Sequence, residues 1–260
     1  MKKSEVQAEL WGKSPDGWAE IQEVLHKPLW EAMLNATEVG PATVFLDVGC
    51  GAGGASTMAK DRKAEVYGID VADGLLSFAR SRIPGGKFQV ADIENLPYED
   101  DMFDVIFAAN SLQYSEDRIA ALHEIKRVCK PKGKVIAGLF AQPEQVDFRT
   151  IFKAVGDAMP EGPKGVGPFE LSMSGVLEDL FNEAGFTNIM MSEVNCPFEY
   201  IDFDTFWYAN ASAGPFQGIM QIVGEDKLKM TVSEAVKDFT LDDGRILFQT
   251  NMFKYVWVHM

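Results

Sequence analysis

The sequence has few cysteines, few basic residues and no long apolar run. Cys50, Cys129 and Cys196 are far apart and odd in number, which argues against a disulfide framework or a paired-cysteine metal site. Lys and Arg total 24 against 39 Asp and Glu, so the net charge is −15. Such a chain repels polyanions, and nucleic acid and anionic membranes are therefore not expected as partners.

The apolar runs, such as residues 135–141, are far too short to cross a bilayer. Residues 1–5 carry two lysines but no apolar stretch follows them, so no secretory signal is expected. With so little cysteine, the simplest prediction is a cytoplasmic protein. The length of 260 residues suits one domain with a sizeable cap. No oligomeric state is predicted.

Short strands alternate with helices in the first part of the chain. Strands are expected at 44–48, 65–69, 87–90, 104–108 and 134–140, with helices at 55–60, 73–82 and 117–129. Such alternation predicts βαβ units, and hence an α/β fold with a parallel sheet covered on both faces. Two further strands are expected at 189–194 and within 246–258.

The first forty residues show a different pattern. Trp18, Ile21, Val24 and Leu25 recur at helical spacing. Residues 1–40 are therefore predicted to form an N-terminal helical cap segment.

The chain after this segment divides into a core and its insertions. Residues 41–140 are expected to form the ligand-binding core, and 141–260 to complete the sheet. Cap insertions are expected at about 141–170 and 197–243. Residues 160–168 hold three prolines and three glycines, which predicts a mobile loop.

A glycine-rich segment, residues 47–54, follows the first strand and precedes a helix. Glycines there let the chain turn sharply and let a ligand approach the main chain. Gly49, Gly51 and Gly54 satisfy the GxGxxG pattern of dinucleotide sites, which by itself is weak. Asp47 would repel a pyrophosphate but favour an ammonium or sulfonium ligand, of which S-adenosylmethionine is one.

Two more acids end the next two strands. Asp70 can accept hydrogen bonds from ribose hydroxyls, which nicotinamide cofactors and S-adenosylmethionine share. Asp92 can accept from an adenine amino group. Capping of a turn or helix is the alternative role for each acid, Asp47 included. Cys50 has no ligand or base at useful spacing and is interpreted as a small loop residue.

Several motifs resemble, in order and spacing, those of class I S-adenosylmethionine-dependent methyltransferases. The branch that they resemble includes the ubiquinone and menaquinone C-methyltransferases. The motifs are residues 47–53, 67–70, 91–98, 103–106 and 122–135. The resemblance implies a Rossmann-like sheet of seven strands, mostly parallel with the last strand antiparallel, and a helical cap.

The resemblance also implies a cofactor, S-adenosylmethionine, and the residues that bind it. These are Asp47, Gly49, Cys50, Gly51, Gly53, Asp70, Val71, Asp92, Ile93, Asn110 and Ser111. Many relatives carry a histidine or another polar residue just after the fourth strand. Here the run is Leu112-Gln113-Tyr114, so no catalytic base is carried over from the family.

Methyl transfer is an in-line displacement, for which the protein supplies alignment and desolvation and needs a base only if the acceptor must lose a proton. Tyr114 and His26 are the candidates for such a base. An aromatic-rich acceptor site predicts a small apolar or aromatic acceptor, although packing in a core is the alternative role for its members. The candidates are Trp11, Tyr114, Phe198, Tyr200 and Trp207. No metal site is expected.

The leading interpretation is methyl transfer to O, N or C of a small molecule. One alternative is a protein of this fold that binds S-adenosylmethionine without transferring methyl, such as a cyclase-like or regulatory protein. A nicotinamide-dependent oxidoreductase is a weaker alternative, because Asp47 and Asp92 do not suit it and no Tyr-x-x-x-Lys pairing is present. A nucleic-acid methyltransferase is disfavoured by the charge and by Asn110-Ser111-Leu112-Gln113, which lacks the paired prolines.

Overall fold

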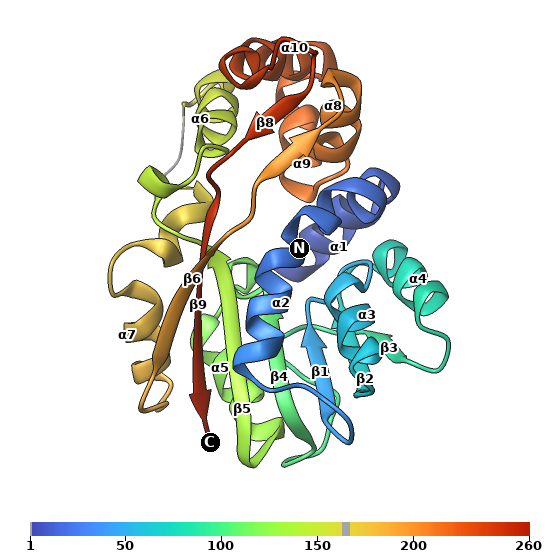
Figure 1. Ribbon diagram of the computed structural model, residues 1–260, viewed down its shortest axis with the longest axis vertical. Helices are drawn as coiled ribbons and strands as arrows, with labels where there is room; N and C mark the ends of the chain where they lie inside the picture. Colours follow the sequence, from blue (N-terminus) through green and yellow to red (C-terminus); the bar gives the residue numbers. More distant parts are fainter. Residues whose placement is uncertain (1, 163–166) are drawn as a thin grey trace.

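The structure, a computed structural model, describes residues 2–162 and 167–260 (Figure 1). Its main sheet has the strand order β3-β2-β1-β4-β5-β9-β6. Strand β9 is antiparallel to both of its neighbours, and the remaining strands run parallel to one another. The predicted fold class, a Rossmann-like sheet of seven strands with the last one antiparallel, is confirmed. The centre of the predicted mobile loop, residues 163–166, lies outside the described residues.

The main sheet comprises β1 (Val44–Val48), β2 (Glu65–Asp70), β3 (Lys87–Val90), β4 (Phe103–Ala109), β5 (Cys129–Phe140), β6 (Met190–Asn195) and β9 (Met252–His259). A separate two-stranded antiparallel sheet consists of β7 (Phe198–Tyr200) and β8 (Ile246–Phe248). The α-helices are α1 (Lys3–Gly12), α2 (Lys27–Ala36), α3 (Gly54–Asp61), α4 (Asp73–Arg82), α5 (Arg118–Val128), α6 (Arg149–Ala158), α7 (Val176–Glu183), α8 (Phe203–Ala211), α9 (Gly214–Val223) and α10 (Glu225–Ala235).

Strand β1 explains why the sheet is covered on both faces. Successive side chains of a strand point to opposite faces. Phe45 accordingly packs into one apolar cluster, with Phe107 of β4, whereas Leu46 packs into the other, with Ile106. Strands β2 and β4 flank β1, so the strand order reverses here. In sheets of this kind ligands bind beyond the carboxyl ends of the strands at this point.

The N-terminal segment is helical, as its spacing predicted. Between α1 and α2 a π-helical turn (Trp18–Gln22) runs into a 3₁₀ turn (Glu23–His26). The apolar residues on which the helical prediction rested are not the most buried residues of the segment. Val24 is 50% exposed, whereas Gln22, Glu23 and His26 are buried. Glu23 faces inward and accepts from the Ala52 N–H of the glycine loop, whereas Gln22 accepts from the Tyr200 hydroxyl of the cap.

Helices gather beyond the carboxyl ends of the parallel strands (Figure 1). Helices α6, α8, α9 and α10 and the β7–β8 pair lie at that end, and α1 lies between them and the sheet. Helices α6, α8 and α9 lie in segments for which no helix or strand was predicted, whereas α7 and α10 overlap helices expected at 174–184 and 231–239. The expected strand within 246–258 is two strands, β8 and β9, which belong to different sheets. None of the helices in the described part of the chain is long and apolar enough to span a membrane.

Candidate functional site

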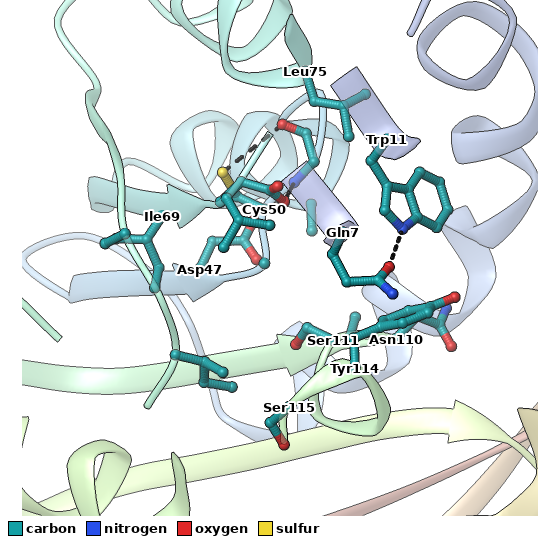
Figure 2. A pocket seen from close by; sticks show the side chains of 18 of the residues that line it. Gln7, Trp11, Asp47, Cys50, Ile69, Leu75, Asn110, Ser111, Tyr114 and Ser115 are labelled. Atoms are coloured by element: carbon teal, nitrogen blue, oxygen red, sulfur yellow. Dashed lines mark hydrogen bonds between the residues drawn. The ribbon is translucent and has the colours of Figure 1, made fainter. Parts of the chain in front are cut away.

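A cavity lies at the carboxyl ends of β1, β2, β3 and β4, beneath the N-terminal segment (Figure 2). It holds about 1060 Å³ of empty space, including the part open to solvent. Its wall comprises Ser4, Gln7, Trp11, Trp18, Glu23, His26, Trp30, Asp47, Gly49, Cys50, Gly51, Ala55, Ile69, Asp70, Val71, Leu75, Ala91, Asp92, Ile93, Glu94, Ala109, Asn110, Ser111, Tyr114 and Ser115.

The glycine loop between β1 and α3 forms one side of this wall. At Gly49 φ is +73°, and an added Cβ would stand 2.4 Å from the Cβ of Ser111. A glycine is therefore required by both the backbone conformation and the close approach. Gly53 lies outside the wall. It also has a positive φ, +84°, but an added Cβ there would meet Ala79 of α4, so this glycine serves the packing of two helices.

Asp70 ends β2 and points into the cavity region, beside Val71. Its Oδ2 accepts a hydrogen bond from the Gly51 backbone N–H and its Oδ1 accepts one from Ala72, both at 2.9 Å. Burial raises the pKa of this carboxyl. A carboxylate offers about four lone-pair sites, so these two bonds hold the group in place while leaving capacity for a ligand's hydroxyls.

Asp47, near the end of β1, is fully enclosed, with 2% of its surface exposed. The Ser56 hydroxyl donates to its Oδ2 at 2.7 Å. Burial, together with the neighbouring charges of Glu23 and Asp70, raises the pKa of Asp47 to about 7. A cationic group in the cavity would relieve this repulsion and favour the ionised carboxylate.

Glu23 is a residue of the wall that sequence reasoning missed. Its Oε1 accepts from the Ala52 N–H at 2.8 Å, and its Oε2 from Arg82 of α4 at 2.6 Å. Burial raises the pKa of Glu23 to about 7, although Arg82 acts in the opposite direction. The side chain thereby ties the N-terminal segment to the glycine loop and to α4. The polar stripe of Gln22, Glu23 and His26 in an otherwise apolar helix was the signal available.

The segment after β3 forms the next part of the wall, where Asp92 and Ile93 were expected. The Glu94 N–H donates to Oδ1 of Asp92 at 3.1 Å. Glu94 in turn accepts from the N–H groups of Glu116 and Asp117 at 2.5 and 3.1 Å. These bonds order the turn that carries Asp92.

Three buried side-chain polar atoms beyond β4 have no hydrogen-bond partner among the described residues. One of them, Oε1 of Gln113, lies outside the wall of the cavity, and the other two lie on it. These two are Oδ1 of Asn110 and Oγ of Ser111. Asn110 also has a positive φ of +55°. Burying a polar atom without a partner costs about 1–3 kcal/mol, so such atoms at a cavity wall point to a ligand that supplies the missing bonds. The donors and acceptors present thus fit an adenosyl amino acid.

Aromatic rings form the side of the wall under α1. Trp11 contacts Trp18 edge-on with ring centroids 4.6 Å apart, and Tyr114 with centroids 5.9 Å apart. The indole N–H of Trp11 donates to Gln7 at 3.1 Å. Figure 2 shows Trp11, Gln7 and Tyr114 beside one another and apart from Asp47. Trp11 and Tyr114, two of the predicted acceptor residues, are therefore brought together.

His26 also reaches the wall, and its ring is neutral. Burial lowers its pKa to about 4. Its Nδ1 lies 3.1 Å from the carbonyl oxygen of Gln22 and 3.3 Å from that of Glu23. Carbonyl oxygens only accept, so we assign the proton to Nδ1 and the lone pair to Nε2. Both predicted base candidates, His26 and Tyr114, line the cavity.

The other three predicted acceptor residues lie outside the wall. Phe198, Tyr200 and Trp207 are buried in the apolar cluster of the cap. Strand β7 pairs with β8 and turns the first two rings into that core, where Phe198 contacts the His26 ring at 5.2 Å. The Tyr200 hydroxyl donates to Gln22 at 2.6 Å. These residues support the N-terminal segment from behind.

Within residues 2–162 and 167–260, no group of three His, Cys, Asp or Glu side chains is arranged to hold a metal ion.

Comparison with known proteins identifies the core. Residues 46–137 match a family described as a methyltransferase domain. Malonyl-[acyl-carrier protein] O-methyltransferase from Halorhodospira halophila is 35% identical over 52% of this chain and 48% of its own length. Demethylmenaquinone methyltransferase from Streptomyces griseus is 33% identical over 48% of this chain and 54% of its own length. The chain thus spans about half the length of these curated relatives.

Solved structures share the fold at low sequence identity. The YcgJ protein from Bacillus subtilis has a TM-score of 0.58 at 19% identity, covering 88% of this chain and 97% of its own. The [4+2]-cyclase SpnF has a TM-score of 0.55 at 20% identity, covering 88% and 80%. The strand order, the glycine loop and the family match agree, and residues 46–137 are a methyltransferase domain of the class I S-adenosylmethionine-dependent family.

Proposed function

We propose that this protein transfers the methyl group of S-adenosylmethionine to a small acceptor with an apolar or aromatic part. One observation supports this most. A single cavity joins the acids at the ends of three successive strands, Asp47, Asp70 and Asp92, to an aromatic wall under α1. The first part suits an adenosyl cofactor and the second an apolar acceptor.

In this proposal, the residues at the strand ends each bind a different part of the cofactor. Asp70 binds the ribose hydroxyls with its remaining lone pairs. Asp92 accepts from the adenine amino group, with the Ile93 N–H at the ring. Asp47 supports the amino group of the methionine part, which the main chain around Gly49 and Gly51 faces. When bound, the cofactor supplies a methyl group activated by a sulfonium.

The remaining predicted residues lie where the cofactor part of the cavity meets the acceptor part. Asn110 and Ser111 offer their unpaired oxygens to the methionine part or to the acceptor. Cys50 and Val71 shape the wall of the cavity and have no chemical role in this proposal. Burial raises the pKa of the Cys50 thiol well above its ordinary value. A buried thiol of this kind is a poor nucleophile.

The cap has a role of its own in the proposal. Residues 1–40 cover the reaction site and exclude water, and α9, in the insertion at about 197–243, packs against them. Trp11 lies against Gly214 at the start of α9, where an added Cβ would stand 2.5 Å from the indole nitrogen. Gly74 of α4 similarly abuts the Gly12 carbonyl. Helix α1 is thus wedged between the cap and the core, which fits a cover over bound ligands.

The first test is calorimetric titration with S-adenosylmethionine, S-adenosylhomocysteine and NAD. We expect micromolar binding of both adenosyl ligands and none of NAD. Asp70→Ala should weaken that binding at least about tenfold, since it removes charge-assisted bonds worth ~1.5–3 kcal/mol. Asp61→Ala, at an exposed position on α3, is the matched control and should bind normally. Binding of NAD alone would contradict the cofactor assignment.

The second test is transfer of labelled methyl to a panel of phenols, amines and carbon acids. Product formation with any of them supports the proposal. Tight cofactor binding without transfer to any acceptor would instead support the alternative function, in which the fold binds the cofactor but moves no methyl group. The likeness to a [4+2]-cyclase shows only that this fold is compatible with such a use.

A further inference from the structure

The wall of the cavity carries charge of one sign. Among its described residues are five carboxyl side chains and no lysine or arginine. The five are Glu23, Asp47, Asp70, Asp92 and Glu94. The cofactor's own carboxylate is offset by its ammonium and sulfonium groups. An acceptor that brings a further carboxylate or a phosphate would bury a negative charge among these groups with no positive partner on the wall. Such burial is strongly unfavourable.

Two cations approach the wall from behind, but both are engaged. Arg82 donates to Glu23 and to the backbone carbonyls of Ala52 and Ala19. Lys3 donates from Nζ to the Ser115 carbonyl at 2.8 Å. Each cation therefore already has protein partners, and neither lines the cavity.

The aromatic part of the wall offers what a cation needs. The faces of tryptophan and tyrosine attract cations, and desolvated tryptophan is the best of these partners. Trp11 and Tyr114 meet here at nearly perpendicular angles, and Trp18 continues the wall toward the glycine loop. The indole nitrogen of Trp18 lies 3.7 Å from where a Cβ on Gly51 would stand. The rings therefore border the loop that faces the reacting end of the cofactor.

The groups beside these rings are poor bases for a hydroxyl acceptor. Burial raises the pKa of Tyr114 to about 12, so it stays protonated. Burial lowers the pKa of His26 to about 4, far below that of a phenol or an alcohol. Glu23 is held by Arg82 and by the Ala52 N–H. An alcohol or phenol must lose its proton to a base during methyl transfer, because its neutral oxygen is a weak nucleophile. An ammonium ion can lose its proton to water before it reacts, and the neutral amine then attacks with no further proton transfer.

We propose that the acceptor is an amine whose nitrogen lies against Trp11, Trp18 and Tyr114. This rests on the proposed methyl transfer and adds the substrate class. The bound ammonium ion first releases one proton to water, which frees the nitrogen lone pair. That lone pair forms a bond to the methyl carbon while the carbon–sulfur bond breaks and its electron pair stays on sulfur. Positive charge passes from sulfur to nitrogen, so the nitrogen is a cation against the rings both when the acceptor binds and after the transfer.

The binding test uses a permanent cation and its neutral isostere. Phenethyltrimethylammonium and the matching tert-butyl compound have the same shape and differ in charge. Their binding is measured by tryptophan fluorescence and calorimetry, with and without S-adenosylhomocysteine. We expect the cation to bind about tenfold more tightly or better. Equal binding of the two probes, or tighter binding of 3-phenylpropionate, would overturn the proposal.

Variants separate the ring faces from the fold. Trp11→Leu and Trp18→Leu should lose most of the preference for the cation, whereas Trp11→Phe should keep part of it. Trp257→Phe, on β9 and outside the wall, is the matched control and should keep all of it. A preference unchanged in both leucine variants would place the cation elsewhere and refute the assignment.

Measuring methyl transfer separates the proposal of an amine acceptor from the proposal of methyl transfer on which it rests. Initial rates are compared for 2-phenylethylamine, 2-phenylethanol and 3-phenylpropionate. Transfer to the amine alone supports both proposals, and transfer to the alcohol or the acid but not the amine refutes the substrate class only. Preferential binding of the cation without transfer to any probe would refute methyl transfer while leaving the cation site standing.

Discussion

The buried imidazole of His26 makes stability depend on pH in a direction that can be worked out. Burial lowers its pKa from 6.5 to about 4. The unfolded chain takes up this proton near pH 6.5, but the native protein does so only near pH 4. The folded state therefore loses stability as the pH falls through that interval. Between pH 7 and pH 5 the loss from this one group is about 2 kcal/mol.

Two neighbouring carboxyls act in the opposite direction. Burial raises the pKa of both Glu23 and Asp47 to about 7. The native protein holds these protons more tightly than the unfolded chain, so their contribution is present at low pH and is lost as the pH rises through about 7. A measurement on the unaltered protein alone would report the sum of all three groups.

Replacing His26 by glutamine isolates the imidazole. Glutamine keeps an N–H donor for the carbonyls of Gln22 and Glu23 but does not titrate. Urea unfolding of both proteins is followed by tryptophan fluorescence at pH 7 and pH 5. The change in unfolding free energy between the two pH values should differ between the proteins by about 2 kcal/mol. His123→Gln, at an exposed position on α5, is the control. An identical pH dependence in the wild type and His26→Gln would refute the reasoning.

Three further substitutions test the scaffold around the cavity. Arg82→Ala leaves the Glu23 carboxyl buried without its cation and should cost about 3 kcal/mol in urea unfolding at pH 8; a loss below about 1 kcal/mol would show that the pair is unimportant. Gly49→Ala forces a Cβ toward Ser111 and should weaken S-adenosylhomocysteine binding at least about tenfold by calorimetry. Gly53→Ala meets α4 instead, so it should lower stability by about 1–3 kcal/mol; a cofactor affinity reduced as much as in Gly49→Ala would contradict the packing role.

The strand-end acids were accessible from the sequence because the pattern that reveals them is local. A run of alternating or apolar residues marks each strand, and an acid marks where it stops. Parallel strands present their carboxyl ends at one edge, so Asp47, Asp70 and Asp92 had to approach one another. Asn110 and Ser111, after the fourth strand, were predicted from the family resemblance and not from this pattern. All five line the cavity.

Residues that reach the cavity from other elements were harder to find. Glu23 was not singled out from the sequence, and its role in the wall depends on its contacts with the Ala52 N–H and Arg82. Phe198 and Tyr200 looked like pocket residues, but pairing of β7 with β8 turns them into the core of the cap. An aromatic side chain suits a pocket and a core equally, so residue type alone does not separate the two.

The sequence by itself determined the alternation of strands and helices, the parallel sheet and the place of the glycine loop. These follow from short-range periodicity and from what glycine and carboxylate chemistry require. Only the tertiary structure decided which face of the N-terminal segment turns inward, and that Gly53 packs against α4 rather than facing a ligand. It also decided that Trp11 and Tyr114 meet. The Gly53 contact with Ala79 spans 26 positions of the sequence (79 − 53) and the Trp11 contact with Tyr114 spans 103 (114 − 11). Both depend on how whole elements dock rather than on any local pattern.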